Sequence, residues 1–114
     1  AGKMNAVVAI TGAIDIVADA EKAYCIYNGR PEMSSITGTG CQLSALTAAF
    51  VTANQEQPLE AAAAAVCAMG LSGETAYARL GELDGNATYR NYIIDAIYRM
   101  NGEALEAGAK FEVR

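Results

Sequence analysis

Histidine and tryptophan are absent from this 114-residue chain, and it contains only two prolines and two phenylalanines. Without histidine, and without closely paired cysteines, the sequence offers no cluster of the kind that binds zinc. Basic residues are scarce as well, since eight Lys and Arg stand against thirteen Asp and Glu, for a net charge of −5. An acidic chain without basic clusters is a poor candidate for binding nucleic acid.

Long apolar runs are also missing. The longest, residues 61–71, is rich in alanine and too short to cross a bilayer, so we expect no membrane partner. Residues 1–5 do not have the pattern of a signal peptide. The three cysteines, at positions 25, 41 and 67, form an odd set without metal-type spacing. This usage is typical of a reducing compartment and predicts a cytoplasmic protein.

Strand-like segments come first along the chain. The continuous apolar run at residues 7–10 predicts a strand that is buried on both faces. Residues 15–19 and 23–27 predict two further strands joined by a tight turn. Another short strand is predicted at residues 111–113. The length of the chain allows one domain.

Helical periodicity dominates the rest of the sequence. It predicts three main helices and a short fourth one, at residues 42–54, 58–80, 89–100 and 103–108. Pro58 fits the first turn of the second helix, because proline lacks only an amide that would have no partner there. Asn86 or Thr88 is the candidate N-cap of the third helix.

Two glycines inside the second predicted helix, Gly70 and Gly73, each cost about 1 kcal/mol relative to alanine. We interpret them as positions where a neighbouring segment packs closely against the helix. The few short strands cannot cover three long helices. The sequence therefore predicts an α/β protein, with short strands followed by three main helices, that forms part of a larger layered structure.

The most informative segment is the glycine-rich run at residues 35–41, which leads directly into the apolar stretch 43–51. A turn that feeds the start of a helix leaves several backbone amides pointing at one spot, with the positive end of the helix dipole behind them. Such a spot attracts anions, phosphate above all. Cys41 falls at the predicted helix start, where a thiol ionises most easily. Together these features indicate phosphoryl transfer.

Taken in isolation, these residues also have simpler interpretations. The segment 38–40 is not a P-loop, because no Gly-Lys-Ser/Thr follows it. Leu43 stands where a dinucleotide-binding fingerprint has its third glycine. The segment could thus be only a turn before a helix, and Cys41 only a small core residue, since free cysteines are usually buried.

Five segments, in this order and spacing, make the whole chain resemble the C-terminal portion of hydroxyethylthiazole kinases, which belong to the ribokinase-like superfamily. They are residues 7–12, 28–29, 37–46, 58–65 and 92–98. The resemblance covers nearly all of the chain and somewhat under half of a complete family member. It implies that residues 1–114 are the C-terminal segment of a single ribokinase-like domain whose N-terminal half is absent.

The resemblance implies ATP-dependent phosphorylation of the primary alcohol of 4-methyl-5-(2-hydroxyethyl)thiazole in thiamine salvage, with Mg²⁺. It also implies a homotrimer with thiazole sites between subunits. By position, Thr11 and Thr37 would contact ATP, and Gly38 would lie against the thiazole. Cys41 would be the catalytic base, at a position where most ribokinase relatives have aspartate. The anion hole would consist of the amides of Gly38, Thr39, Gly40 and Cys41.

In the family, the acidic residues near magnesium, an arginine on the phosphates and a methionine against the thiazole lie upstream of this segment. No motif assigns Asp15, Asp19 or Glu74 to a metal. We therefore expect the chain alone to be inactive and its missing N-terminal half to be its partner. Two alternatives stay open. One is another ribokinase-like enzyme, which Cys41 disfavours; the other is a non-catalytic half-domain that binds an anion or nucleotide or serves in assembly.

Overall fold

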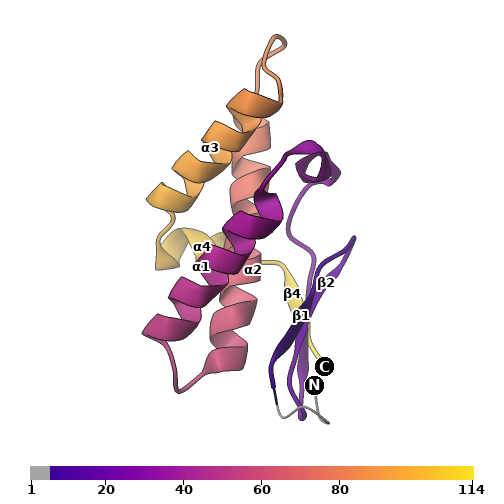
Figure 1. The fold of residues 1–114 in the computed structure, drawn as a ribbon, viewed down its shortest axis with the longest axis vertical. Coiled ribbons are helices and arrows are strands. Elements are labelled where there is room, and N and C mark those ends of the chain that lie inside the picture. Colours follow the sequence, from indigo (N-terminus) through magenta and orange to yellow (C-terminus); the bar gives the residue numbers. More distant parts are fainter. Residues whose placement is uncertain (1–5) are drawn as a thin grey trace.

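The structure, a computed structural model, describes residues 6–114; the expectation about a signal peptide at residues 1–5 lies outside this range. The predicted order of four strands and four α-helices is confirmed, and a 3₁₀ helix that was not predicted lies between β3 and α1 (Figure 1). The strands are β1 (Val8–Ile10), β2 (Asp15–Ala18), β3 (Ala23–Ile26) and β4 (Phe111–Val113). The helices are the 3₁₀ helix η1 (Pro31–Ser35), α1 (Thr39–Ala53), α2 (Pro58–Arg79), α3 (Asn86–Arg99) and α4 (Gly102–Gly108).

The four strands form one antiparallel sheet in the order β1-β2-β3-β4. Between β2 and β3, the Asp19 carboxylate accepts hydrogen bonds from the amides of Glu21 (2.8 Å) and Lys22 (3.0 Å), which fixes the tight turn. The last strand, β4, returns from the far end of the chain to pair with β3. The first and last strands of the described chain thus form the two opposite edges of one sheet.

One face of the sheet packs against α2. Val17 and Ile26 point from this face into the core and are fully buried. They form a cluster with α2 residues that include Leu59, Ala62 and Val66. Full burial of one such aliphatic side chain stabilises the fold by roughly 1.5–3 kcal/mol. The alanine-rich start of α2 leaves room for the larger side chains of the sheet.

The other face of the sheet is not covered by any helix among residues 6–114 (Figure 1). Ile10 and Ile16 lie opposite each other in the β1–β2 ladder and are 63% and 40% exposed. Tyr27, just after β3, is 39% exposed. The prediction that residues 7–10 are buried on both faces is therefore wrong for this part of the chain. An apolar run reports a tendency to be buried, and it carries no information on which segment provides the cover.

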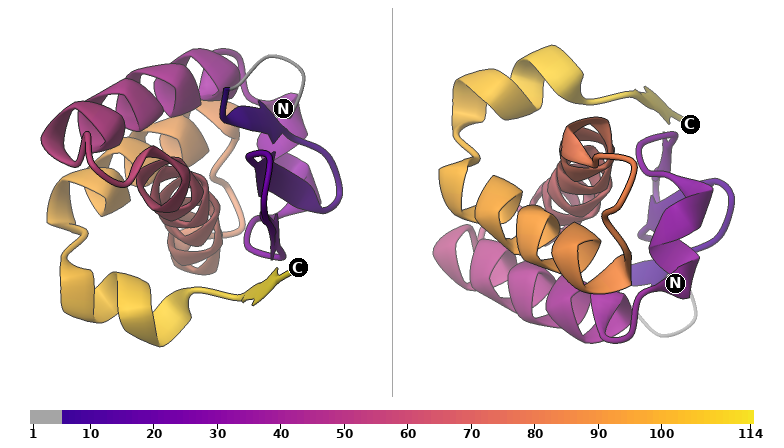
Figure 2. Two further views of the ribbon diagram at one scale, coloured as in Figure 1. Left: turned by 90° about the horizontal axis from the view of Figure 1, so that it is seen from below. Right: turned by 90° about the horizontal axis from the view of Figure 1, so that it is seen from above.

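The longest helix, α2, runs through the middle of the molecule, with the other helices and the sheet arranged around it (Figure 2). On its α3 side, Tyr89 and Ile93 are buried in a second cluster with Met69 and Ala76 of α2. The Tyr89 hydroxyl donates to the carbonyl of Gly73 at 2.9 Å. Burial raises the pKa of Tyr89 to about 12, so this hydroxyl stays a donor at neutral pH.

Helix α3 begins without a side-chain cap. Its N-cap residue is Gly85, and the prediction that Asn86 or Thr88 caps the helix is wrong. The Asn86 amide instead donates to the carbonyl of Ser35 at 3.3 Å and so ties the start of α3 to the end of η1. Among residues 6–114, no helix combines the length and the apolar character that a membrane span requires.

Candidate active site

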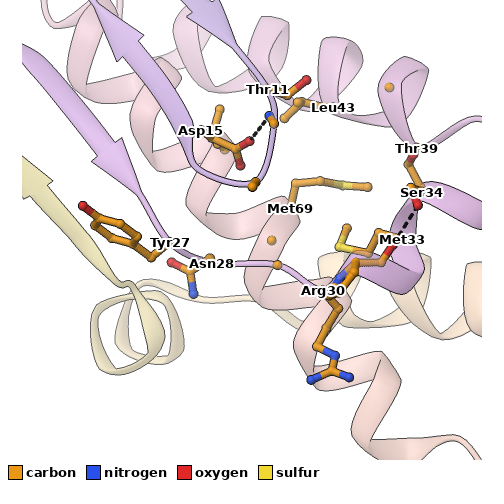
Figure 3. A pocket seen from close by; sticks show the side chains of 17 residues that line it. Thr11, Asp15, Tyr27, Asn28, Arg30, Met33, Ser34, Thr39, Leu43 and Met69 are labelled. Carbon is orange, nitrogen blue, oxygen red and sulfur yellow. Dashed lines mark hydrogen bonds between the residues drawn. The ribbon is translucent and has the colours of Figure 1, made fainter.

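A cavity of about 550 Å³ opens where five elements meet (Figure 3). Its walls are the β1–β2 turn, the loop from β3 to η1, η1 itself, the first turn of α1 and the middle of α2. The lining mixes polar groups with the apolar side chains of Leu43, Val66 and Met69. The glycine-rich segment and the β1–β2 turn lie far apart in the sequence, and the fold places both of them at this cavity.

The glycine-rich segment forms the predicted turn before a helix, and the helix begins at Thr39 rather than at residue 42. Gly38 is its N-cap residue and has a φ of +95°, a conformation that L side chains rarely adopt. The amide of Gln42 donates to the Gly38 carbonyl at 2.9 Å. Within residues 6–114, the amides of Gly40 and Cys41 have no protein acceptor, as expected for the first turn of a helix.

The structure brings three of the predicted site residues together. Thr39 and Gly40 line the cavity from the start of α1, and Thr11 lines it from the β1–β2 turn (Figure 3). Thr37, which was predicted to contact ATP, is exposed and lies outside the cavity lining among the described residues.

Gly38 and Cys41 flank the cavity lining in the sequence and are not part of it. Cys41 is exposed, so the simpler interpretation of this residue as a core cysteine is wrong. Cys67 is the buried cysteine: it packs in the core between α2 and the sheet, where burial raises its pKa to about 11. Cys25 is only partly buried. Cys41 is thus the cysteine that a solvent-borne substrate can reach most readily.

Asp15 is a cavity residue to which the sequence assigned no role. Its carboxylate accepts a hydrogen bond from the Gly12 amide at 2.9 Å, which fixes the turn that presents Thr11. Burial raises the pKa of Asp15, and this hydrogen bond opposes the rise. In the sequence, the only sign of this contact is an acidic residue three positions after a glycine, a pattern that is common in turns.

The loop that follows β3 contributes four more cavity residues, Tyr27, Asn28, Gly29 and Arg30, and the sequence analysis assigned a functional role to none of them. The Arg30 guanidinium lies over the ring of Tyr77 at 4.1 Å, and its Nε donates to Glu32 at 2.9 Å. Figure 3 shows this side chain directed away from the cavity. Among the described residues, negative charge in the cavity would therefore be met by backbone amides rather than by arginine.

The predicted close packing against the two glycines of α2 is confirmed. A Cβ atom added at Gly70 would lie 2.7 Å from Cβ of Asn28, and one added at Gly73 would collide with the sulfur of Met33. The absence of side chains at these two positions seats the cavity loop and η1 directly on α2.

The donor set fits a phosphate group better than a metal ion. The amides at the start of α1 are unpartnered, which suits phosphate oxygens. Asp15 is the one carboxylate that lines the cavity among residues 6–114, and no cluster of three or more His, Cys, Asp or Glu that could hold a metal occurs in that range. Any Mg²⁺ that serves this site needs additional ligands from elsewhere.

The chain matches one family among the known proteins. A sequence profile of the hydroxyethylthiazole kinase family matches residues 1–103. The chain belongs to the hydroxyethylthiazole kinase family. It is 58% identical over 110 residues to the hydroxyethylthiazole kinase of Clostridium acetobutylicum, a match that covers 96% of this chain and 40% of that protein. It is 38% identical to the maize (Zea mays) hydroxyethylthiazole kinase, covering 96% of this chain and 38% of the maize protein.

The fold of the family is shared as well. The structure of hydroxyethylthiazole kinase from Pyrococcus horikoshii OT3 superimposes with a TM-score of 0.87 at 34% sequence identity. The superposition covers 98% of this chain and 42% of the Pyrococcus protein. The chain therefore spans about two fifths of the length of these kinases.

Proposed function

We propose that this chain is the C-terminal portion of an ATP-dependent kinase that phosphorylates the primary alcohol of 4-methyl-5-(2-hydroxyethyl)thiazole. The observation that carries the proposal is the pair of unpartnered amides of Gly40 and Cys41 at the start of α1, beside a cavity that Gly40 and Thr11 both line, in a chain of this family. Kinases of this type supply a phosphate ester for thiamine salvage.

The anion hole does the electrostatic part of the reaction in this proposal. During transfer, negative charge spreads over the oxygens of the γ-phosphoryl group. The amides from Gly38 to Cys41 are fixed by the helix that follows them, so they stabilise this charge without reorganising. Loss of one such donor in comparable sites costs roughly 3–4 kcal/mol. Thr11 and Thr37 would contact the nucleotide from the β1–β2 turn and from the segment before Gly38.

Cys41 is proposed as the base. Its side chain is exposed, and the residue before it, Gly40, lines the cavity. An alcohol beside the transferred phosphoryl group would therefore lie near the Cys41 sulfur. As a thiolate, the sulfur would take the hydroxyl proton while the new O–P bond forms and the bond from the γ-phosphorus to the departing ADP breaks, a contribution of about 10²–10⁴-fold in rate. Gly38, which lacks a side chain and precedes the helix, would lie against the thiazole ring.

The remaining three fifths of the protein would supply what the described residues lack. We propose that it lies N-terminal to this chain, provides the carboxylates for Mg²⁺ and completes a homotrimer in the cytoplasm. Mg²⁺ would neutralise charge on the nucleotide phosphates. The chain alone would bind anions through α1 but would not turn over substrate.

The test is a reassembled enzyme. The N-terminal part of the Clostridium acetobutylicum kinase that this chain does not match would be joined to residues 1–114. We expect ATP-dependent phosphorylation of the thiazole alcohol, with no turnover by either part alone. A folded and trimeric fusion without turnover would contradict the proposal and favour a non-catalytic anion-binding role.

A further inference from the structure

The carboxylate of Glu74, on α2, joins three segments that are distant in the sequence. Its Oε2 accepts hydrogen bonds from Nδ2 of Asn28 (2.7 Å) and from the amide of Gly29 (3.0 Å). Its Oε1 pairs with Nζ of Lys110 at 2.7 Å. Glu74 does not line the cavity, but Asn28 and Gly29 do. It therefore contacts the cavity wall from behind.

Asn28 closes the same network. This side chain is buried, and its Nδ2 also donates to the carbonyl of Gly108 at 3.0 Å. Its Oδ1 accepts from the amide of Lys110 at 2.8 Å, and the carbonyl of Lys110 accepts from the amide of Tyr27 at 2.8 Å. The cavity loop is thus bonded to α2 and to the segment between α4 and β4 at once.

Burial alone would raise the pKa of Glu74, but its hydrogen bonds with Lys110, Asn28 and Gly29 together lower it. The carboxylate is therefore charged at neutral pH, with a side chain only 20% exposed. Hydrogen bonds to a charged group are stronger than neutral ones. Gly29 has a φ of +113°, a conformation that glycine adopts readily and that L side chains rarely adopt.

We propose that Glu74 is a positioning residue of the kinase: through Gly29 and Asn28 it holds the cavity wall that faces the start of α1, and thereby sets the affinity for the nucleotide. Lys110 assists by pairing with the second carboxylate oxygen. This inference rests on the proposed function, because only the proposed function assigns the cavity to the nucleotide. The transfer chemistry at Cys41 does not depend on Glu74.

The first test measures the position of the loop in the 114-residue chain. Amide hydrogen exchange would be followed at Gly29 in the wild type and in Glu74→Ala, with Glu60→Ala as matched control. Glu60 is on the same helix and pairs with Lys22 at 2.8 Å, away from the cavity. We expect exchange at Gly29 to be at least tenfold faster in Glu74→Ala, intermediate in Glu74→Gln and unchanged in Glu60→Ala. Unchanged exchange in Glu74→Ala would overturn the inference.

The second test uses the reassembled enzyme. We expect Glu74→Ala to raise KM for ATP at least fivefold while kcat stays within twofold, and Glu74→Gln to restore part of the affinity. A purely structural role would lower the active fraction, and hence apparent kcat, without changing KM. Faster exchange at Gly29 with an unchanged KM would therefore overturn the inference. If the wild-type fusion folds and has no turnover, the proposed function fails, and with it the assignment to the nucleotide.

Discussion

The backbone of Gly70 in α2 lies directly against Asn28. A Cβ atom built on Gly70 would be 2.7 Å from Cβ and 2.8 Å from the carbonyl carbon of Asn28. Asn28 cannot retreat, because its side chain is bonded to Glu74, Gly108 and the amide of Lys110. At Gly73, one turn further along the helix, the nearest atoms belong to the side chain of Met33, which is flexible.

This contrast predicts different outcomes for two similar substitutions. Alanine favours a helix over glycine by about 1 kcal/mol, whereas overpacking against a fixed neighbour costs typically 1–3 kcal/mol. We expect Gly70→Ala to lower the free energy of unfolding by up to about 2 kcal/mol after this offset. In Gly73→Ala, the Met33 side chain can turn away, so the change should be within about 1 kcal/mol of zero. Urea unfolding of both variants measures the difference, and equal stabilities would contradict the argument.

Removal of the proposed base should act on kcat. In the reassembled kinase, we expect Cys41→Ala to lower kcat by about 10²–10⁴-fold with a modest change in KM, because the sulfur acts only on the proton of the alcohol. Cys25→Ala is the matched control: Cys25 lies in β3, away from the cavity lining, and its loss should leave kcat near the wild-type value. Turnover retained in Cys41→Ala would remove this residue from the mechanism.

The environments of the cysteines also predict an order of alkylation. Cys41 is exposed, whereas Cys67 is buried and its pKa is raised to about 11. Iodoacetamide reacts with the thiolate, so at about pH 8 the folded chain should be modified first at Cys41 and last at Cys67. Peptide mass spectrometry at successive times gives the order. Early modification of Cys67 would indicate that the core between α2 and the sheet opens readily.

Ser72 predicts a stabilising substitution. It is fully buried in α2, and its hydroxyl has no hydrogen-bond partner among the described residues. An unsatisfied buried polar group costs about 1–3 kcal/mol. We therefore expect Ser72→Ala to raise the free energy of unfolding of the chain by about 1 kcal/mol or more. Ser44→Ala, at an exposed position of α1, controls for the helix propensity of alanine and should change stability much less.

The lowered pKa of Glu74 predicts how its contribution to stability varies with pH. A carboxylate whose pKa is lower in the folded state stabilises the fold fully above its ordinary value of 4.5, and this contribution is lost as the pH falls through the lowered value. The difference in unfolding free energy between wild type and Glu74→Gln should therefore be constant from about pH 7 to about pH 5 and shrink below that range. A difference that does not depend on pH would show that the charge of Glu74 is irrelevant to the fold.

The elements with local signals were predicted well from the sequence. Pro58 marks the first residue of α2, and the helical period ends it within one residue of Arg79. Local sequence patterns also predicted α4 and the short terminal strand β4. The glycine-rich turn at residues 35–41 located the start of α1 to within three residues, at residue 42 rather than at Thr39, because glycine chemistry there is local too.

The wall of the cavity could not be predicted in the same way. Asn28 lies 46 residues from Glu74 and 82 from Lys110, and no periodicity or turn rule connects such positions. Likewise, the exposure of Ile10 depends on what covers the sheet in the complete protein, which a local pattern does not contain. Sequence reasoning thus located the helix that we propose to meet the anion, and it missed the contacts that hold the loop between β3 and η1.

The uncovered face of the sheet has a practical consequence for anyone who produces this chain by itself. Its outermost strand, β1, pairs only with β2 among residues 6–114, and the apolar side chains of Ile10 and Ile16 lie beside that free edge. Unpaired edges next to apolar surface recruit strands from other molecules. We expect the isolated chain to self-associate as its concentration rises, so the exchange and unfolding measurements on it require dilute samples.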